Sequence, residues 1–199
     1  MLKKFAGGLV LLLSIAAASA QTAPDAFVRQ ISTDVINAAK TDKSVQAGDT
    51  SRIVGLVDTK VMPNVDFETV TRSAVGPKWR EATPEQRQKL QDEFKKLLVR
   101  VYAGALTQVG DQTVEITKTQ PVAGSTQVVV QSEVRGKGEP IKLDYRLDKV
   151  GDGWKIIDVN VGGIWLVTSY RSQFAQEINA GGIDGLIAKL SERNKANAK

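Results

Sequence analysis

The sequence contains no cysteine and no histidine in 199 residues. Without cysteine, the chain cannot form a disulfide, a thiolate metal site or a cysteine nucleophile. Without histidine, it lacks the commonest general base at neutral pH and any Ser-His-Asp triad. The nucleophile-elbow, phosphate-loop and dinucleotide-binding glycine motifs are missing as well. These absences favour a binding protein over an enzyme, and they predict no metal or organic cofactor.

The sequence also lacks an apolar run long enough to cross a bilayer, which takes about 20 residues. Its most apolar stretch covers residues 9–18, after lysines at positions 3 and 4, and an Ala-Ser-Ala triplet follows at 18–20. A basic start, a short apolar run and an A-x-A site are typical of a secretory signal peptide. We therefore predict a cleaved signal peptide at 1–20 and a single exported domain at 21–199. A retained membrane anchor is the alternative reading.

Positively charged residues exceed negatively charged residues only slightly. The full chain carries +5, and removal of Lys3 and Lys4 leaves +3, because residues 1–20 contain no acid. Weak basicity is compatible with an anionic membrane surface, and also with many proteins that have no such partner. No basic stripe interleaved with aromatic residues is present, so we expect no nucleic-acid partner.

The first half of the chain predicts helices. Apolar residues recur with a 3.6-residue period over 25–40, and a shorter amphipathic segment over 53–61 ends at Pro63. Between them, residues 41–50 are polar and predict turns. A third helix is expected from the Asp66 cap to the Gly-Pro pair at 76–77.

The longest predicted helix begins at a capping box. Thr83 and Gln86 have the spacing of that box, with Pro84 at the first helical position. The apolar period then continues to about Val109, which gives a helix of roughly 37 Å at 1.5 Å per residue.

The second half predicts strands and then helices. Alternating apolar residues separated by short turns indicate an antiparallel meander of four strands near 113–117, 127–135, 141–148 and 154–161. A helix is expected over 164–178 and, after the Gly181-Gly182 break, a short helix around 183–190. Helices segregated from such a sheet make an α+β domain.

Six segments in order resemble one known family. They are Pro63-x-x-Asp66-Phe67-x-x-Val70-Thr71-Arg72, Gly76-x-x-Trp79-Arg80-x-Ala82-Thr83-Pro84-x-Gln86-Arg87, Phe94-x-x-Leu97-Leu98-Val99-Arg100-x-Tyr102-Ala103, Gly153-Trp154-Lys155-Ile156-x-Asp158-Val159, Tyr170-Arg171-Ser172-Gln173-Phe174 and Gly182-Ile183-Asp184-x-Leu186-Ile187. Their order and spacing resemble MlaC, the toluene-tolerance family of periplasmic phospholipid-binding proteins. The resemblance extends over essentially the whole of residues 21–199. It departs at Trp165, where the family usually has a small residue.

The resemblance implies a fold and a function. It implies that the predicted four-stranded antiparallel sheet is twisted and packs against N-terminal and C-terminal helices, with an apolar pocket between them. It implies a periplasmic carrier whose cargo is phospholipid. Its partners would be an inner-membrane ABC transporter complex with a lipid-binding ring and an outer-membrane lipoprotein–porin complex, and its role the maintenance of outer-membrane lipid asymmetry. We expect the protein to be a monomer.

Apolar residues of three elements could line such a pocket: the sheet, the long helix and a lid-like segment over 57–70. An ordinary packed core requires the same side chains, so the sequence alone does not separate the two. The predicted lipid-binding residues are Val57, Val61, Phe67, Val70, Leu97, Val101, Tyr102, Ala105, Val128, Val130, Val134, Leu143, Tyr145, Trp154, Ile156 and Trp165. On this basis, aspartate in place of Val101 or Val130 is predicted to reduce bound lipid.

Polar residues give weaker predictions. Arg80, Arg146 and Arg171 could meet a phosphate, because guanidinium suits that geometry, although surface pairing is the alternative. Asp158 is predicted to be a structural hydrogen-bond acceptor. Two other functions stay open: an enzyme on a nuclear transport factor 2-like scaffold with a buried carboxylate at Asp144, Asp158 or Glu133, and an interaction module with a filled core. Strand alternation points Asp144 and Glu133 away from the apolar face, which counts against the enzyme.

Overall fold

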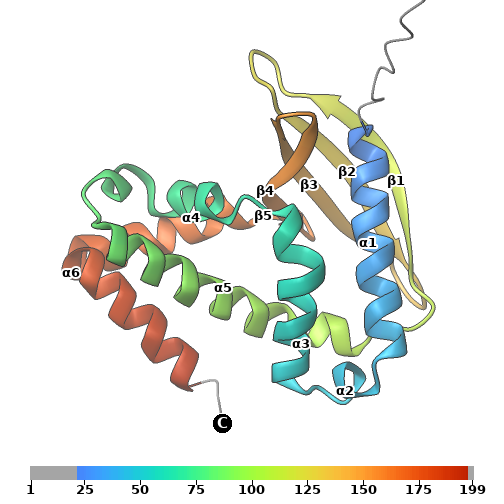
Figure 1. Ribbon diagram of the computed structural model, residues 1–199, viewed down its shortest axis with the longest axis horizontal. Coiled ribbons are helices and arrows are strands. Elements are labelled where there is room, and N and C mark those ends of the chain that lie inside the picture. The colour runs from blue at the N-terminus through green and yellow to red at the C-terminus, as the bar shows by residue number, and fades with distance from the viewer. Residues whose placement is uncertain (1–21, 197–199) are drawn as a thin grey trace, which may run out of the picture.

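The computed structural model describes residues 22–196, so the predicted signal peptide at 1–20 lies outside the described residues. The chain forms helices first, then a meander of strands, and then one long helix (Figure 1). The predicted α+β class is confirmed. Within residues 22–196, no helix combines the length and the apolar character needed to cross a bilayer.

Three helices open the domain. Helix α1 (Pro24–Thr41) has its proline in the first turn, where no backbone amide hydrogen is needed. Helices α2 (Lys43–Gln46) and α3 (Thr50–Leu56) follow. The prediction of turns over 41–50 was therefore wrong for α2. The physical reason is Asp42, whose carboxylate accepts hydrogen bonds from two backbone amides of α2 and so stabilises this single turn.

A run of unusual helical turns connects α3 to the next helix. The chain passes through a π-helical turn, η1 (Val57–Val61), and a 3-10 turn, η2 (Met62–Asn64). Helix α4 (Phe67–Val75) begins at the predicted cap, since Asp66 accepts a hydrogen bond of 2.9 Å from a first-turn amide. It ends at η3 (Gly76–Arg80), where the glycine has a φ of 74° that other residues rarely adopt.

Helix α5 (Pro84–Thr107) confirms the predicted capping box. The amide of Gln86 donates to the Thr83 hydroxyl at 3.2 Å, and the amide of Thr83 donates to the Gln86 side chain at 3.0 Å. The Gln86 side chain also donates to Asp184 at 2.8 Å. The cap of α5 is therefore tied to the C-terminal helix, 98 residues further along the chain.

The sheet is a meander with strand order β1-β2-β3-β4-β5. All neighbouring strands pair antiparallel. The strands are β1 (Thr113–Pro121), β2 (Val128–Arg135), β3 (Ile141–Val150), β4 (Gly153–Val161) and β5 (Ile164–Trp165). The prediction of four strands missed β5, because two residues are too few to show the alternation that marks a strand.

Two bulges shape the sheet. The β1–β2 register shifts between Ile116 and Lys118, and the β3–β4 register shifts opposite Ile157. Because side chains alternate along a regular strand, the second bulge allows both Ile156 and Val159 to face the helices.

Helix α6 (Leu166–Ala196) closes the chain. It bends at Gly182, whose φ of 67° and ψ of −165° are not helical. The predicted break at Gly181-Gly182 is thus a bend at Gly182 within a longer helical element. Figure 1 shows α6 running beside α5 and α4, on the far side of α3 from the main part of the sheet.

The apolar core consists of three separate clusters. The first joins α4, α5 and α6 around Phe94, the second joins α1 to the sheet around Leu147, and the third joins α1, α2, α3 and the end of α5 around Ile53. A domain of this size more commonly has one contiguous core. The three clusters surround the site described next.

Candidate binding cavity

A cavity of about 530 Å³ lies between the helices and the sheet. Its volume falls within the usual range of small-molecule sites, roughly 300–1,000 Å³. Helices α1 and α5, the π-helical turn η1, the start of α4 and the four strands β1 to β4 supply most of the wall. The apolar lining residues are Ile31, Val35, Ile36, Val57, Val61, Met62, Val65, Phe67, Val70, Phe94, Leu98, Val99, Ala105, Leu106, Val109, Val114, Val134, Ile141, Leu143, Ile156, Val159, Val161 and Leu166.

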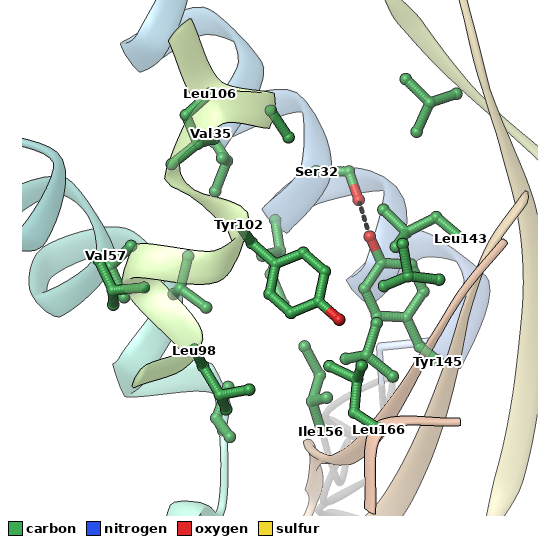
Figure 2. Close-up of a pocket in the computed structure, with 18 of the residues that line it drawn as sticks. Ser32, Val35, Val57, Leu98, Tyr102, Leu106, Leu143, Tyr145, Ile156 and Leu166 are labelled. Carbon is green, nitrogen blue, oxygen red and sulfur yellow. Dashed lines mark hydrogen bonds between the residues drawn. The ribbon is translucent and has the colours of Figure 1, made fainter. Parts of the chain in front are cut away.

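Helical and strand periods aim these side chains inward. On α5, Leu98, Tyr102 and Leu106 follow one another at steps of four and so share one face of the helix. On β3, Leu143 and Tyr145 alternate with residues that point to the opposite face. Figure 2 shows Tyr102 and Tyr145 reaching into the space between α5 and the sheet, with Leu98, Ile156 and Leu166 around it.

The interior of the cavity carries almost no charge. The Ser32 and Tyr145 hydroxyls lie 3.2 Å apart, which satisfies both groups within the wall (Figure 2). Burial raises the pKa of Tyr145, and burial also raises the pKa of Tyr102, so both phenols are neutral near pH 7. Lys95 pairs with Asp58 at 2.9 Å, which joins α5 to η1. The site therefore suits an uncharged, apolar guest.

Asp158 is the one acid in the lining, and it has a structural role, as predicted. One of its carboxylate oxygens accepts hydrogen bonds from the amides of Val159, at 2.9 Å, and Val167, at 3.0 Å. Burial raises the pKa of Asp158, although those two hydrogen bonds oppose the rise. The carboxylate fixes the start of α6, so its position is explained without chemistry on a substrate.

The other two candidate acids of the enzyme hypothesis do not line the cavity. Asp144 accepts a hydrogen bond from the amide of Ser132 at 3.2 Å, and Glu133 pairs with Arg135 at 2.9 Å. Among residues 22–196, no cluster of acidic side chains has the arrangement of a metal site.

Ten of the sixteen predicted lipid-binding residues line the cavity: Val57, Val61, Phe67, Val70, Tyr102, Ala105, Val134, Leu143, Tyr145 and Ile156. They come from all three predicted elements, the lid-like segment, the long helix and the sheet. Their contact with a lipid stays a prediction.

Two predicted residues of α5 were misplaced. Leu97 is buried in the cluster with α6, and Val101 is 54% exposed to solvent. Each helical residue turns the side chain by about 100°, so Leu98 and Tyr102 face the cavity while their neighbours Leu97 and Val101 do not. The prediction that aspartate at Val101 reduces bound lipid is therefore replaced by one at Leu98.

Four predicted residues of the strands were also misplaced. Val128, Val130 and Trp154 pack in the cluster between α1 and the sheet. The Trp154 indole donates to the carbonyl of Thr22 at 3.0 Å, just before α1 begins. Helix α1 packs over this part of the sheet, so these three side chains contact α1 instead of lining the cavity. Trp165 lies elsewhere, with its ring centroid 4.7 Å from the Arg146 guanidinium, so the departure at this position does not alter the cavity wall.

The largest omission of the sequence prediction is helix α1. Ile31, Val35 and Ile36 line the cavity, although the sequence indicated only an amphipathic helix there. The apolar face of α1 contacts the second core cluster, the third core cluster and the cavity, so its periodic pattern does not show which residues face the cavity.

The three arginines considered for a phosphate do not line the cavity either. Arg146 and Arg171 lie behind its wall, and Arg80 is exposed on η3.

Comparison with known proteins gives one consistent family. The family model described as MlaC protein matches residues 29–192. The toluene tolerance protein ttg2D of Pseudomonas putida is 27% identical over 199 residues, which cover 95% of this chain and 92% of the relative. The intermembrane phospholipid transport system binding protein MlaC of Haemophilus influenzae is 23% identical over 180 residues, covering 88% and 84% of the two chains.

A solved structure has the same fold. The phospholipid-binding protein from Ralstonia solanacearum, determined in complex with a phospholipid, aligns with a TM-score of 0.85 and 44% sequence identity. The alignment covers 89% of this chain and all of that one. The similarity therefore extends over both the helices and the sheet that enclose the cavity.

Proposed function

The chain belongs to the MlaC family, and we propose that it is a periplasmic carrier that holds the acyl chains of a phospholipid in its cavity. The observation that carries this proposal is an apolar space of about 530 Å³ enclosed by three separate core clusters. The Ralstonia relative, whose structure contains a phospholipid, supports the choice of cargo.

The energetics explain why a carrier needs such a space. Burial of one methylene is worth about 0.8 kcal/mol, so two ordinary acyl chains of about 30 methylenes cost on the order of 20 kcal/mol to move into water. A protein that carries them through water must offset most of this free energy with its own apolar wall. The twenty-three apolar side chains of the lining provide that wall.

The cavity is smaller than two acyl chains require. Two chains need on the order of 800 Å³, near the upper end of usual ligand cavities. We therefore propose that the cavity widens as the cargo enters and that the η1 turn (Val57–Val61) is the part that moves. A π-helical turn within a helical segment is often found at functional sites, and here it is joined to α5 by the Asp58–Lys95 pair.

Two features argue against the alternative functions. An interaction module with a filled core would leave no space of this size between the sheet and the helices. An enzyme on this scaffold would need a carboxylate free to act as a base, whereas one oxygen of Asp158 already accepts two backbone hydrogen bonds. We propose a binding protein without catalytic activity.

We further propose that the carrier shuttles phospholipid between an inner-membrane ABC transporter complex and an outer-membrane lipoprotein–porin complex, and so maintains lipid asymmetry. The test places the two complexes in separate vesicle populations, one of which holds a fluorescent phospholipid. We expect transfer between them to depend on the chain and to rise in proportion to its concentration. The Leu98→Asp variant, whose cavity is made polar, should not support it.

Two outcomes of this assay would separate the parts of the proposal. Equal transfer with and without the chain would refute the shuttle. A chain that carries lipid through purification but exchanges it with neither complex would refute the partners and leave lipid binding intact.

A further inference from the structure

A second, polar hollow of about 220 Å³ lies behind the wall of the lipid cavity. We call it the polar cleft, lined among others by Thr69, Ser73, Arg146, Asp158, Thr168 and Arg171. It is separated from the cavity by α4, β4 and the start of α6, and Asp158 borders both spaces. It is therefore a second site rather than an extension of the first.

Helices α4 and α6 present apolar side chains to the lipid cavity and polar side chains to the polar cleft. On α4, Val70 faces the cavity and Ser73 faces the cleft; on α6, Leu166 faces the cavity and Thr168 faces the cleft. Polar residues alone would be expected on any outer surface. A hollow enclosed by polar residues, with two arginines directed toward it, is not expected there.

The two arginines are held in place by contacts other than ion pairs. The Arg146 guanidinium stacks on the Trp165 ring at 4.7 Å, and its Nε is enclosed without a hydrogen-bond partner in the described part of the chain. Arg171 is anchored through its Nε, which donates to the carbonyl of Ser73 at 2.8 Å. Neither arginine forms an ion pair within residues 22–196. Both are thus oriented by the protein while their remaining nitrogens stay available.

The remaining groups of the cleft favour an anion. Asp158 is its only acid, so the two arginines and this carboxylate sum to +1. One Asp158 oxygen already accepts two backbone amides. Ser73 and Thr168 line the hollow, and their hydroxyls can donate hydrogen bonds to an anion there. Guanidinium groups and hydroxyls on several sides match the tetrahedrally arranged oxygens of a phosphoryl group better than the planar oxygens of a carboxylate.

We propose that the polar cleft binds a phosphoryl oxyanion, separately from the acyl chains in the cavity. Arg146 and Arg171 contact the phosphoryl oxygens, while Ser73 and Thr168 donate hydrogen bonds. The volume leaves room for a small substituent such as glycerol. The source is either a soluble phosphate compound or the head group of a lipid in an adjoining bilayer.

The test titrates the lipid-loaded mature protein with inorganic phosphate and with glycerol 3-phosphate at constant ionic strength. Binding is followed through the amide signals of residues 167 and 168 in NMR spectra. We expect saturable shifts in the wild-type protein. Arg146→Gln and Arg171→Gln should each weaken binding by roughly 10-fold, because each removes a charge-assisted hydrogen bond. Arg171 is exposed, so its variant stays informative if Arg146→Gln fails to fold.

Two further variants predict effects in different directions. Asp158→Asn keeps an acceptor oxygen for the two backbone amides and removes the negative charge, so it should tighten binding. Arg80→Gln removes an exposed arginine from outside the cleft and should change nothing. Vesicles distinguish the two sources: arginine-dependent binding to phosphatidylglycerol but not phosphatidylcholine assigns a head group, and its absence assigns a soluble phosphate.

Three results would overturn the proposal. One is the absence of saturable shifts with either phosphate compound. Another is an equal loss in the Arg80 and Arg171 variants, which would indicate non-specific charge. The third is succinate binding as tightly as phosphate, which would point to a carboxylate site.

Discussion

Aspartate in place of Leu98 is expected to leave a folded protein that has lost most of its phospholipid. Leu98 faces the cavity from the middle of α5, and Figure 2 shows its side chain directed into the space below Tyr102. An ionised carboxylate among acyl chains loses its hydration and gains no partner. We expect a loss of about 3 kcal/mol in lipid binding, or roughly 100-fold in Kd.

Val101→Asp is the matched control. It introduces the same side chain on the same helix, three residues away, at a position that is 54% exposed. Lipid content should be unchanged, because the carboxylate stays in water. Phospholipid is quantified in organic extracts of both variants, with circular dichroism as the check on folding. Equal lipid content in the two variants would contradict the assignment of the cavity as the acyl-chain site.

Removal of the Phe94 ring is expected to have the opposite effect, with large destabilisation and little loss of lipid. Phe94 is fully buried, and its ring centroid lies 4.9 Å from that of Tyr170, 5.0 Å from that of Phe174 and 5.8 Å from that of Phe67. Truncation of such a residue to alanine costs about 3–5 kcal/mol. For a domain of this size, the melting temperature should fall by about 10 °C.

The Phe94 variant should nevertheless bind lipid, because the ring also borders the cavity and its removal enlarges an apolar space. Phe67→Ala is the control. Phe67 is only half-buried, so this substitution should lower the free energy of unfolding by less. Chemical denaturation gives the free energy of unfolding, and extraction gives the lipid content. A Phe94→Ala protein as stable as the wild type would show that this cluster does not anchor the three helices around the cavity.

The helix ends were the part of the fold most accessible from sequence. Thr83 with Gln86, and Asp66, act through side-chain hydrogen bonds to amides three residues away, so their signal is local. Asp42 caps α2 in the same way. The polar residues that follow it predicted turns, so α2 was not predicted. The strand β5 had no signal, because two residues owe their strand geometry to the neighbouring β4.

The cavity was less accessible, because an apolar side chain gives the same signal whether it packs against protein or faces a space. Val130 and Val134 lie on the same face of β2, yet the first is buried under α1 and the second lines the cavity. The difference depends on where α1 crosses the sheet, which the β2 sequence does not encode. Leu97 and Leu98 differ only in their direction on α5, and the choice between them depends on the position of α6.

The division of the core into three clusters explains how the fold can contain an unfilled cavity. Each cluster is closed by its own buried residues, such as Phe94, Leu147 and Ile53, so the fold does not need the central space to be filled by protein. A guest that enters adds burial to a domain that is already formed. This is the property that a carrier needs, because it must be stable both loaded and empty.

The most direct test of the account is the lipid content of the wild-type protein itself. The mature chain is purified without detergent from a lipid-rich host, extracted with organic solvent and analysed by mass spectrometry against the protein concentration. The account predicts phospholipid in near-stoichiometric amount, lost in the Leu98→Asp variant and retained in Val101→Asp. Protein that emerges empty, with the cavity filled only by water, would contradict it.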